Sequence, residues 1–316
     1  MVSYMVSFSH MLFRYEYQGG VWIDLEQPTE DELREVVKEF SINERLEKEM
    51  FSPTPTPLVI DGGNTILLEL HFPTQEDESG ETNSQEVDFV VGNHFIITVR
   101  YEIVAPLHHL KKLFETRDLV TGHESITTDV LLEVLFAHLF AAVRDRSNHI
   151  TDQLRRVERD MFDGRERATV RSISNISRAF LHLEADLASQ EEPLNRFLRA
   201  HTLRDFFDES FNERAERILA ERVQVMNLIK THRAVAIEMR ETNTALLESR
   251  QNEIMKTLTV ITFIFLPLEL ITFVFGMRLL GMPLEQNPNG FWIVIGSMFT
   301  IGMLITIILA KKRWIF

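Results

Sequence analysis

One carboxylate, Glu269, interrupts an apolar run at residues 257–276, near the C-terminal end of the chain. A charged side chain at the centre of a membrane helix costs about 2.5 kcal/mol or more, so it normally faces a water-filled cavity or a partner group. Spacings of three and four residues place it on one helical stripe with Asn252, Met255, Thr259, Thr262, Leu266 and Phe273. The oxygen-bearing side chains of this stripe have the chemistry to contact hydrated cations.

The same spacing has a second interpretation. A stripe of this kind also serves to pack one helix against others in a bundle, and Glu269 would then be protonated or paired locally between helices. The sequence alone leaves both interpretations open.

Two apolar runs predict a membrane hairpin at the C-terminus. Residues 257–276 and 291–310 are each long enough, as helices rising about 1.5 Å per residue, to cross roughly 30 Å of hydrocarbon. Only the loop 277–290 separates the two runs, so both outer ends of the hairpin lie on one side of the membrane. The hairpin is also the element expected to direct the protein to the membrane.

Basic residues predict the orientation of this hairpin. Lys256 precedes the first run, and a basic ring of Lys311, Lys312 and Arg313 follows the second run in the tail 311–316. Because lysine and arginine are enriched on the cytoplasmic side, both termini are expected in the cytoplasm and the loop on the periplasmic or external side. We therefore expect a multi-pass protein of the cell inner membrane.

The composition excludes several classes of function. The 316-residue chain carries a formal net charge of -14, which argues against nucleic acid and is compatible with cations. It has no cysteine, so disulfides and thiolate metal sites are excluded. No phosphate-binding loop, zinc-enzyme histidine spacing or serine elbow is present, so nothing in the sequence predicts an enzyme.

Residues 1–122 are predicted to form a mixed α/β domain. A helix with acidic residues in its first turn is expected to begin near Pro28 and to end near Phe40. The proline-rich segment 52–57 cannot be helix or central strand. Gly92 and Asn93 are expected to form a two-residue turn between the last two strands. The predicted strands are residues 21–25, 65–72, 86–91 and 94–100.

Long helices are predicted for the remainder of the chain. Residues 123–205 form a long-helix region with a break near Asp163 and Gly164 and a kink at Pro193. Nothing stops a helix over residues 206–276, so a stalk roughly 105 Å long is expected to continue into the first membrane span. The predicted fold class is α+β, with an α/β domain, long stalk helices and a C-terminal hairpin.

The order of these motifs resembles that of the CorA-type metal-ion transporters. Segments 252–259 and 264–268, followed by Gly276 and Met277, are similar to the pore helix of that family. Met282 and Pro283 in the loop and the basic, aromatic end at 311–314 also match. Further similarity to the family's cytoplasmic domain lies at residues 22–25, 70–73, 88–89 and 95–99.

The resemblance implies a funnel-shaped homopentamer in the lipid bilayer, in which five first membrane helices line a pore for divalent cations. Mg²⁺ or a related ion such as Co²⁺, Ni²⁺ or Zn²⁺ would be the transported ion or a regulator, and no cofactor would be bound permanently. Five copies of Glu269 would form a carboxylate ring, the one metal contact that we expect, and Leu258 would be the apolar gate rather than Thr259. The implied pore-lining residues are Asn252, Met255, Leu258, Thr262, Leu266 and Glu269.

Arg278 is the main departure from the family. Gly276, Met277 and Arg278 stand where the family has its Gly-Met-Asn signature at the pore mouth, and a guanidinium has no acceptor for the water around a metal ion. Five arginines about 7 Å from the axis would repel a divalent ion by roughly 2 to 3 kcal/mol after screening. Altered selectivity is therefore expected. Alternatively, Arg278 turns outward to the lipid headgroups or pairs with Glu285 in the loop.

The same departure keeps two other functions open. Leu280 and Leu284 occupy positions where the family often has acidic residues. A scaffold that no longer transports Mg²⁺ would act as a membrane sensor, an interaction protein, or an anion or tension-gated pore. A zinc and proton symporter also relies on a variant signature, although such relatives usually keep the asparagine.

Overall fold

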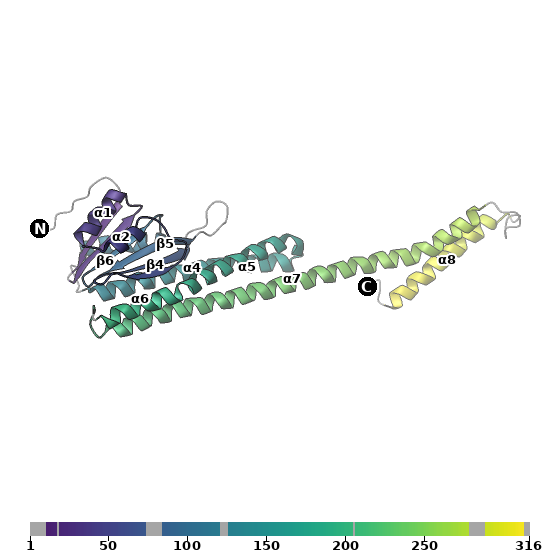
Figure 1. Ribbon diagram of the computed structural model, residues 1–316. Coiled ribbons are helices and arrows are strands. Elements are labelled where there is room, and N and C mark those ends of the chain that lie inside the picture. The colour runs from purple at the N-terminus through teal and green to yellow at the C-terminus, as the bar shows by residue number, and fades with distance from the viewer. Residues whose placement is uncertain are drawn as a thin grey trace. The chain divides into compact units, whose positions relative to one another are not determined.

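The computed structural model describes residues 11–17, 19–73, 84–120, 126–204, 206–277 and 288–312 (Figure 1). The chain divides into two compact units, Met1–Arg240 and Glu241–Phe316. One helix, α7 (Phe211–Gly276), belongs to both units because it begins in the first and ends in the second.

A six-stranded mixed sheet is the centre of the first unit. Its strand order is β1-β2-β6-β5-β4-β3; β2 and β6 run parallel, and every other neighbouring pair is antiparallel. The four predicted strands are confirmed as β2, β4, β5 and β6, whereas β1 and β3 were not predicted. The strands are β1 Met11–Tyr17, β2 Gly20–Glu26, β3 Leu58–Asp61, β4 Ile66–Pro73, β5 Ser84–Val91 and β6 Phe95–Arg100.

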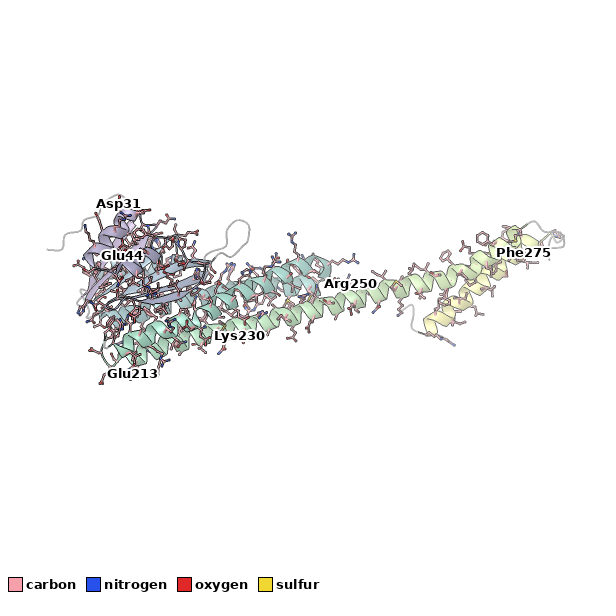
Figure 2. The ribbon with its side chains drawn as sticks, in the orientation of Figure 1. Asp31, Glu44, Glu213, Lys230, Arg250 and Phe275 are labelled. Carbon is pink, nitrogen blue, oxygen red and sulfur yellow. The ribbon has the colours of Figure 1, made fainter. Side chains whose placement is uncertain are left out.

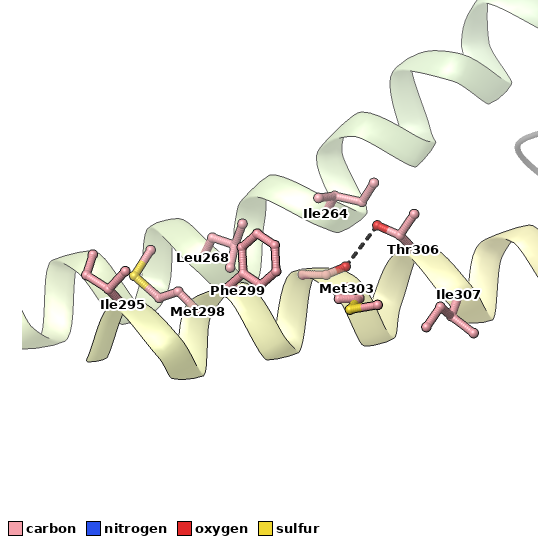
Figure 3. A pocket seen from close by; sticks show the side chains of 9 residues that line it. Ile264, Leu268, Ile295, Met298, Phe299, Met303, Thr306 and Ile307 are labelled. Carbon is pink, nitrogen blue, oxygen red and sulfur yellow. Dashed lines mark hydrogen bonds between the residues drawn. The ribbon is translucent and has the colours of Figure 1, made fainter. Parts of the chain in front are cut away.

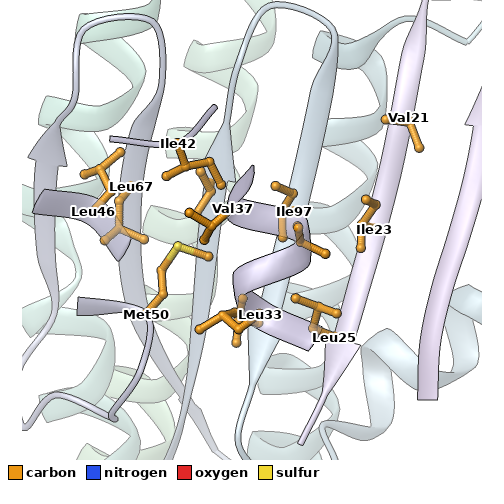
Figure 4. Packing of buried hydrophobic residues seen from close by; sticks show 13 residues of the cluster. Val21, Ile23, Leu25, Leu33, Val37, Ile42, Leu46, Met50, Leu67 and Ile97 are labelled. Carbon is orange, nitrogen blue, oxygen red and sulfur yellow. The ribbon is translucent and has the colours of Figure 1, made fainter. Parts of the chain in front are cut away.

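Two short helices, α1 (Glu30–Glu39) and α2 (Glu44–Glu49), cover one face of the sheet. The predicted start of α1 is confirmed by a capping box: the Thr29 N–H donates to Glu32 Oε2 at 2.8 Å, and the Glu32 N–H donates to Thr29 Oγ1 at 3.3 Å. Leu33 and Leu46 from these helices pack on Ile97 of the sheet in one apolar cluster (Figure 4). Burial of this cluster fixes which face of the sheet receives the helices.

The turn between β5 and β6 lies one residue later than predicted. The Gly92 N–H donates to the Phe95 carbonyl at 3.0 Å, which makes Asn93 and His94 the two turn residues. The Phe95 ring packs closely on Gly92, since a Cβ at position 92 would lie 2.5 Å from Cε1 of that ring.

Helices α3 (Ala105–Val120), α4 (Thr128–Phe162) and α6 (Glu191–Leu203) lie on the opposite face of the sheet (Figure 1). The Phe89 ring of β5 stacks on Phe136 of α4, with ring centroids 5.0 Å apart. Trp22 of β2 meets Phe114 of α3 edge-on at 5.7 Å. The first unit is therefore a sheet between two helical layers.

The long helices follow the prediction with two corrections. The break near Asp163 and Gly164 is confirmed: Gly164 adopts φ +88°, which ends α4 before α5 (Glu166–Ser189) begins. At Pro193 the structure has a full break rather than a kink, since α5 ends before this proline and α6 places it in its first turn, where a missing N–H costs little. The stalk helix α7 begins at Phe211, later than the predicted residue 206.

The second unit contains the rest of α7 and α8 (Gly290–Lys311). Both predicted apolar runs are therefore helical over their whole length. Pro267 lies inside α7 without ending it.

A wholly buried ion cluster ties β2 to β6. Arg100 Nη2 lies 2.7 Å from Asp24 Oδ2 and 2.9 Å from Glu26 Oε2, and none of the three side chains is more than 4% exposed. The parallel register places Arg100 directly opposite Glu26. Removing the guanidinium would leave two buried carboxylates without a counter-charge.

We expect Arg100→Leu to lower the free energy of unfolding by about 3 to 5 kcal/mol, because breaking one side of a buried ion pair leaves an uncompensated charge. Urea unfolding of the full chain in detergent, followed by tryptophan fluorescence, measures this change. The matched control is Arg14→Leu, since Arg14 pairs with Glu16 and Glu39 at an exposed site and its loss is expected to cost about 1 kcal/mol or less. Equal effects of the two substitutions would contradict the assignment.

Candidate functional site

The apolar segment of α7 and the helix α8 expose apolar surface along almost their whole length. Windows in α7 and α8 have mean hydropathies of 2.3 and 2.5, and only 6% of each window is buried. On α7, Lys230 and Arg250 precede the apolar segment, whereas Phe275 lies in its last turn (Figure 2). Apolar surface of this extent requires hydrocarbon or other apolar helices around it.

One face of α7 packs on α8. Leu268 lies against Gly302, where a Cβ would meet Leu268 Cδ1 at 3.7 Å. Thr272 Oγ1 lies 4.0 Å from Met298 Sδ, and Val260 is only 9% exposed. Beside this contact is a pocket of about 690 Å³ (Figure 3), lined by Ile264, Leu268, Ile295, Met298, Phe299, Gly302, Met303, Thr306 and Ile307.

The predicted stripe lies on the other side of α7. At about 100° per residue, Val260, Leu268 and Ile271 fall within roughly 40° of Ile264, which faces α8. Measured from Ile264, the stripe lies about 120° to 180° around the helix axis. All of its predicted pore-lining members are exposed: Asn252, Met255, Leu258, Thr262, Leu266 and Glu269. Contact with α8 therefore leaves this face free, and we call it the outer face of α7.

Hydrogen bonds within α7 determine which donors and acceptors the outer face offers to a further partner. The Thr262 hydroxyl donates to the Leu258 carbonyl at 2.9 Å, and the Thr259 hydroxyl donates to the Met255 carbonyl at 2.8 Å. Each hydroxyl has a single proton, so only its lone pairs remain for a further partner. An ionised Glu269 also offers acceptors alone. Water around a cation points its hydrogens outward, so this face suits hydrated cations rather than anions.

Glu269 is the one acidic side chain in the apolar part of α7. Within the residues that the structure describes, no group of three or more His, Asp or Glu side chains is arranged to hold a metal ion.

The signature residues are only partly described. Gly276 is the last residue of α7, and the Met277 N–H donates to the Phe273 carbonyl at 3.2 Å, while the Met277 side chain is 56% exposed. Arg278 and Glu285 lie outside the described residues, so their predicted roles remain predictions.

Two members of the basic ring are described. Lys311 is the last residue of α8, and the Lys312 N–H caps the helix by donating to the Ile308 carbonyl at 3.1 Å. Both lysine side chains are exposed. Arg313 lies outside the described residues.

The sequence analysis missed a group of carboxylates in the first unit. Glu69 and Asp88 face each other across β4 and β5, and both are fully buried, with Glu86 close by. Their signal was present in the sequence, because the strand alternation that points Leu67 inward also points Glu69 inward.

Comparisons with known proteins extend over nearly the whole chain. The family model described as CorA-like Mg2+ transporter protein matches residues 17–313. The cobalt/magnesium transport protein CorA of Methanocaldococcus jannaschii is 24% identical over 299 residues, which cover 93% of this chain and 91% of that protein. Both the sheet-containing unit and the C-terminal helices lie within the matched regions.

Solved structures have the same fold. The complete structure of the CorA magnesium transporter from Methanocaldococcus jannaschii matches with a TM-score of 0.80 at 22% identity, over 95% of this chain and 93% of that chain. The structure of the full-length CmaX protein matches with a TM-score of 0.68 at 18% identity, over 93% and 89%. The N-terminal α/β domain, the long helix and the two apolar C-terminal helices are thus one known architecture.

Proposed function

Because the chain belongs to the CorA-like Mg2+ transporter family, we propose that it conducts divalent cations such as Mg²⁺ across a membrane, with selectivity altered by Arg278. The family consists of ion transporters rather than enzymes, and the two apolar helices make this chain a membrane protein. Relatives are named as cobalt/magnesium and divalent cation transporters. Mg²⁺ is therefore the first cargo to test, followed by Co²⁺, Ni²⁺ and Zn²⁺.

The observation that carries the proposal is the outer face of α7. This face points away from α8, and its hydroxyls have already donated their protons to the helix backbone. An ionised carboxylate at Glu269 is costly against lipid, so this level of the outer face favours contact with water. A row of such faces around a water-filled path would pass hydrated cations and repel anions.

One helix cannot enclose a path, so the function requires an oligomer. We propose a homopentamer in which α7 forms the inner ring and α8 the outer ring, with the first unit and both termini in the cytoplasm of the cell and the hairpin in its inner membrane. The basic residues Lys256, Lys311 and Lys312 support this orientation by the positive-inside rule.

The outer face divides into polar and apolar levels along the helix. Met255, Leu258 and Leu266 would form apolar constrictions that close when water leaves them. Glu269 lies seven residues before Gly276, so its ring would sit about 10 Å below the end of α7. Ions entering from the Gly276 end would meet this carboxylate ring before the apolar levels.

Glu269→Gln is expected to lower Mg²⁺ flux about tenfold, because it removes the ring's negative charge while keeping its size and an acceptor oxygen. Flux into vesicles containing purified protein measures the effect. The matched control is Glu253→Gln, since Glu253 lies within about 20° of the direction of Ile264 and off the outer face. If Glu269→Gln conducts like the native chain, Glu269 is not in the conduction path.

Arg278→Asn is expected to raise Mg²⁺ flux by about tenfold or more, because it replaces a ring of repelling cations with acceptors for metal-bound water. Arg278→Lys keeps the charge and is the matched control, with flux expected to stay low. Unchanged flux in Arg278→Asn would mean that the arginine faces away from the pore axis. If neither chain admits Mg²⁺, Co²⁺, Ni²⁺ or Zn²⁺, the proposal fails and a sensor, interaction protein or anion pore is favoured.

A further inference from the structure

Three carboxylates lie side by side beneath a loop of the first unit. In the antiparallel register of β4 and β5, Glu69 is opposite Asp88 and His71 is opposite Glu86. The preceding pair on this face, Leu67 and Val90, belongs to the apolar cluster under α1 and α2. The apolar face of the sheet therefore continues directly into a block of acidic side chains.

These carboxylates are buried without a strong counter-charge. Glu69 and Asp88 are fully buried, and Glu86 is 5% exposed. Among the ion pairs of the described residues, none joins the three to lysine or arginine; the nearest basic group is His71, with Nε2 3.5 Å from Glu86 Oε2. Ionising all three would set like charges against each other in a site that water does not reach.

His71 does not supply a positive charge in this arrangement. Its Nε2 donates to the Thr54 carbonyl at 2.9 Å, so Nε2 carries the proton of the neutral ring. Its Nδ1 is buried with no hydrogen-bond partner in the described structure. A second proton on Nδ1 would therefore be a buried donor without an acceptor, which is unfavourable.

The single proton of the Thr54 hydroxyl implies that one of the neighbouring carboxyl groups is protonated. Thr54 Oγ1 lies 2.8 Å from Glu69 Oε2, 2.9 Å from Glu86 Oε2 and 3.3 Å from the Thr56 carbonyl, yet a hydroxyl has only one proton to donate. Glu86 Oε2 also accepts the Thr54 N–H. Both carboxyl contacts are hydrogen bonds if Thr54 donates to Glu86 and a protonated Glu69 donates to Thr54.

A second hydroxyl gives the same result independently. The Tyr101 oxygen lies 2.9 Å from the Met50 carbonyl, which can only accept, and 3.3 Å from Asp88 Oδ2. Its one proton goes to Met50, so the contact with Asp88 is a hydrogen bond only if Asp88 donates. Each outer oxygen, Glu69 Oε1 and Asp88 Oδ1, is buried and has no partner in the described part of the chain.

We propose that Glu69, Glu86 and Asp88 form a proton-binding site, in which Glu69 and Asp88 are carboxylic acids that donate to Thr54 and Tyr101, and Glu86 accepts from Thr54. The bound protons join the sheet to the 50–57 segment, the loop between α2 and β3, through Thr54 and through the carbonyl of Met50. Deprotonation would break both connections and add repulsion. This site acts as a pH-sensitive latch on the loop, independently of ion conduction.

The surroundings set the pH range of this latch. Burial raises the pKa of Glu69 to about 7, and the charges of Glu86 and of Glu49 at the end of α2 add to the rise; the contact with Thr54 lowers the pKa because the hydroxyl can donate to Glu69 once the carboxyl is ionised. Burial also raises the pKa of Asp88 well above its usual range.

Neighbouring elements add few charges that oppose this shift. Tyr101, just after β6, has its own pKa raised by burial and by Asp88, so it remains a neutral donor. On α5, Asp186 faces His71 and has a pKa raised chiefly by burial. Neither group therefore supplies a positive charge that would lower the pKa of Glu69 or Asp88.

Infrared difference spectra of the full-length protein in D₂O, with EDTA and at about pH 6, test the proposal. Subtracting the Asp88→Asn spectrum and the Glu69→Gln spectrum from that of the native chain should each leave a carbonyl band of a protonated carboxylic acid. Glu30→Gln, an exposed change of the same kind, should leave none. Native-like circular dichroism checks that each variant is folded. Absence of the band from both difference spectra would overturn the proposal.

A pH series and a metal addition complete the test. Because burial raises the pKa of Glu69 from 4.5 to about 7 in the folded state, stability is lost as pH rises through this range, and the melting temperature of the native chain should fall between about pH 5 and about pH 7 and level off above it. Glu69→Gln should flatten this decline, and an equal decline would count against the site. Saturating Mg²⁺ should leave the carboxylic acid bands in place; their loss would mean that a metal ion, not a proton, is the ligand.

Discussion

The cost of placing a charge or an unpaired polar group away from water controls both units of this protein. In the second unit it divides α7 into two faces. The face that carries Ile264 and Leu268 is apolar and packs on α8, whereas the face that carries Thr262 and Glu269 points away from that contact. The threonines satisfy their hydroxyl protons within the helix, whereas an ionised Glu269 offers acceptors alone, so we propose that water faces it. The proposed pore follows from that contact with water.

The first unit meets the same cost in two different ways. Around Arg100, two buried carboxylates are compensated by one guanidinium with short contacts to both. Around Asp88, the carboxylates are equally buried, but no ion pair of the described residues joins them to a lysine or an arginine. In our proposal, bound protons neutralise these carboxyl groups in place of a basic side chain. The first arrangement keeps its counter-charge, because arginine stays charged. The second is expected to lose a proton near neutral pH, and this loss would weaken the attachment of the 50–57 segment to the sheet.

The sequence predicted those parts of the structure that local pattern determines. The apolar helices and four strands were found because run length and β-branched content are local properties. Strand β1 was missed, although Phe13, Tyr15 and Tyr17 alternate inward along it. The stripe containing Glu269 was found by helical spacing, but both sides of α7 are apolar, so only the contact with α8 separates them. The buried carboxylates depend on the register of β4 against β5, which no short segment of sequence contains.

The central claim is that the outer face of α7 meets water while the opposite face does not. The chain has no cysteine, so single thiols can be introduced and labelled in vesicles with a charged, water-soluble reagent. We expect Leu266→Cys and Glu269→Cys to react, and Ile264→Cys and Leu268→Cys to remain unlabelled. Equal labelling of the two pairs, or labelling of the α8-facing pair alone, would contradict the assignment of a water-filled path to this face.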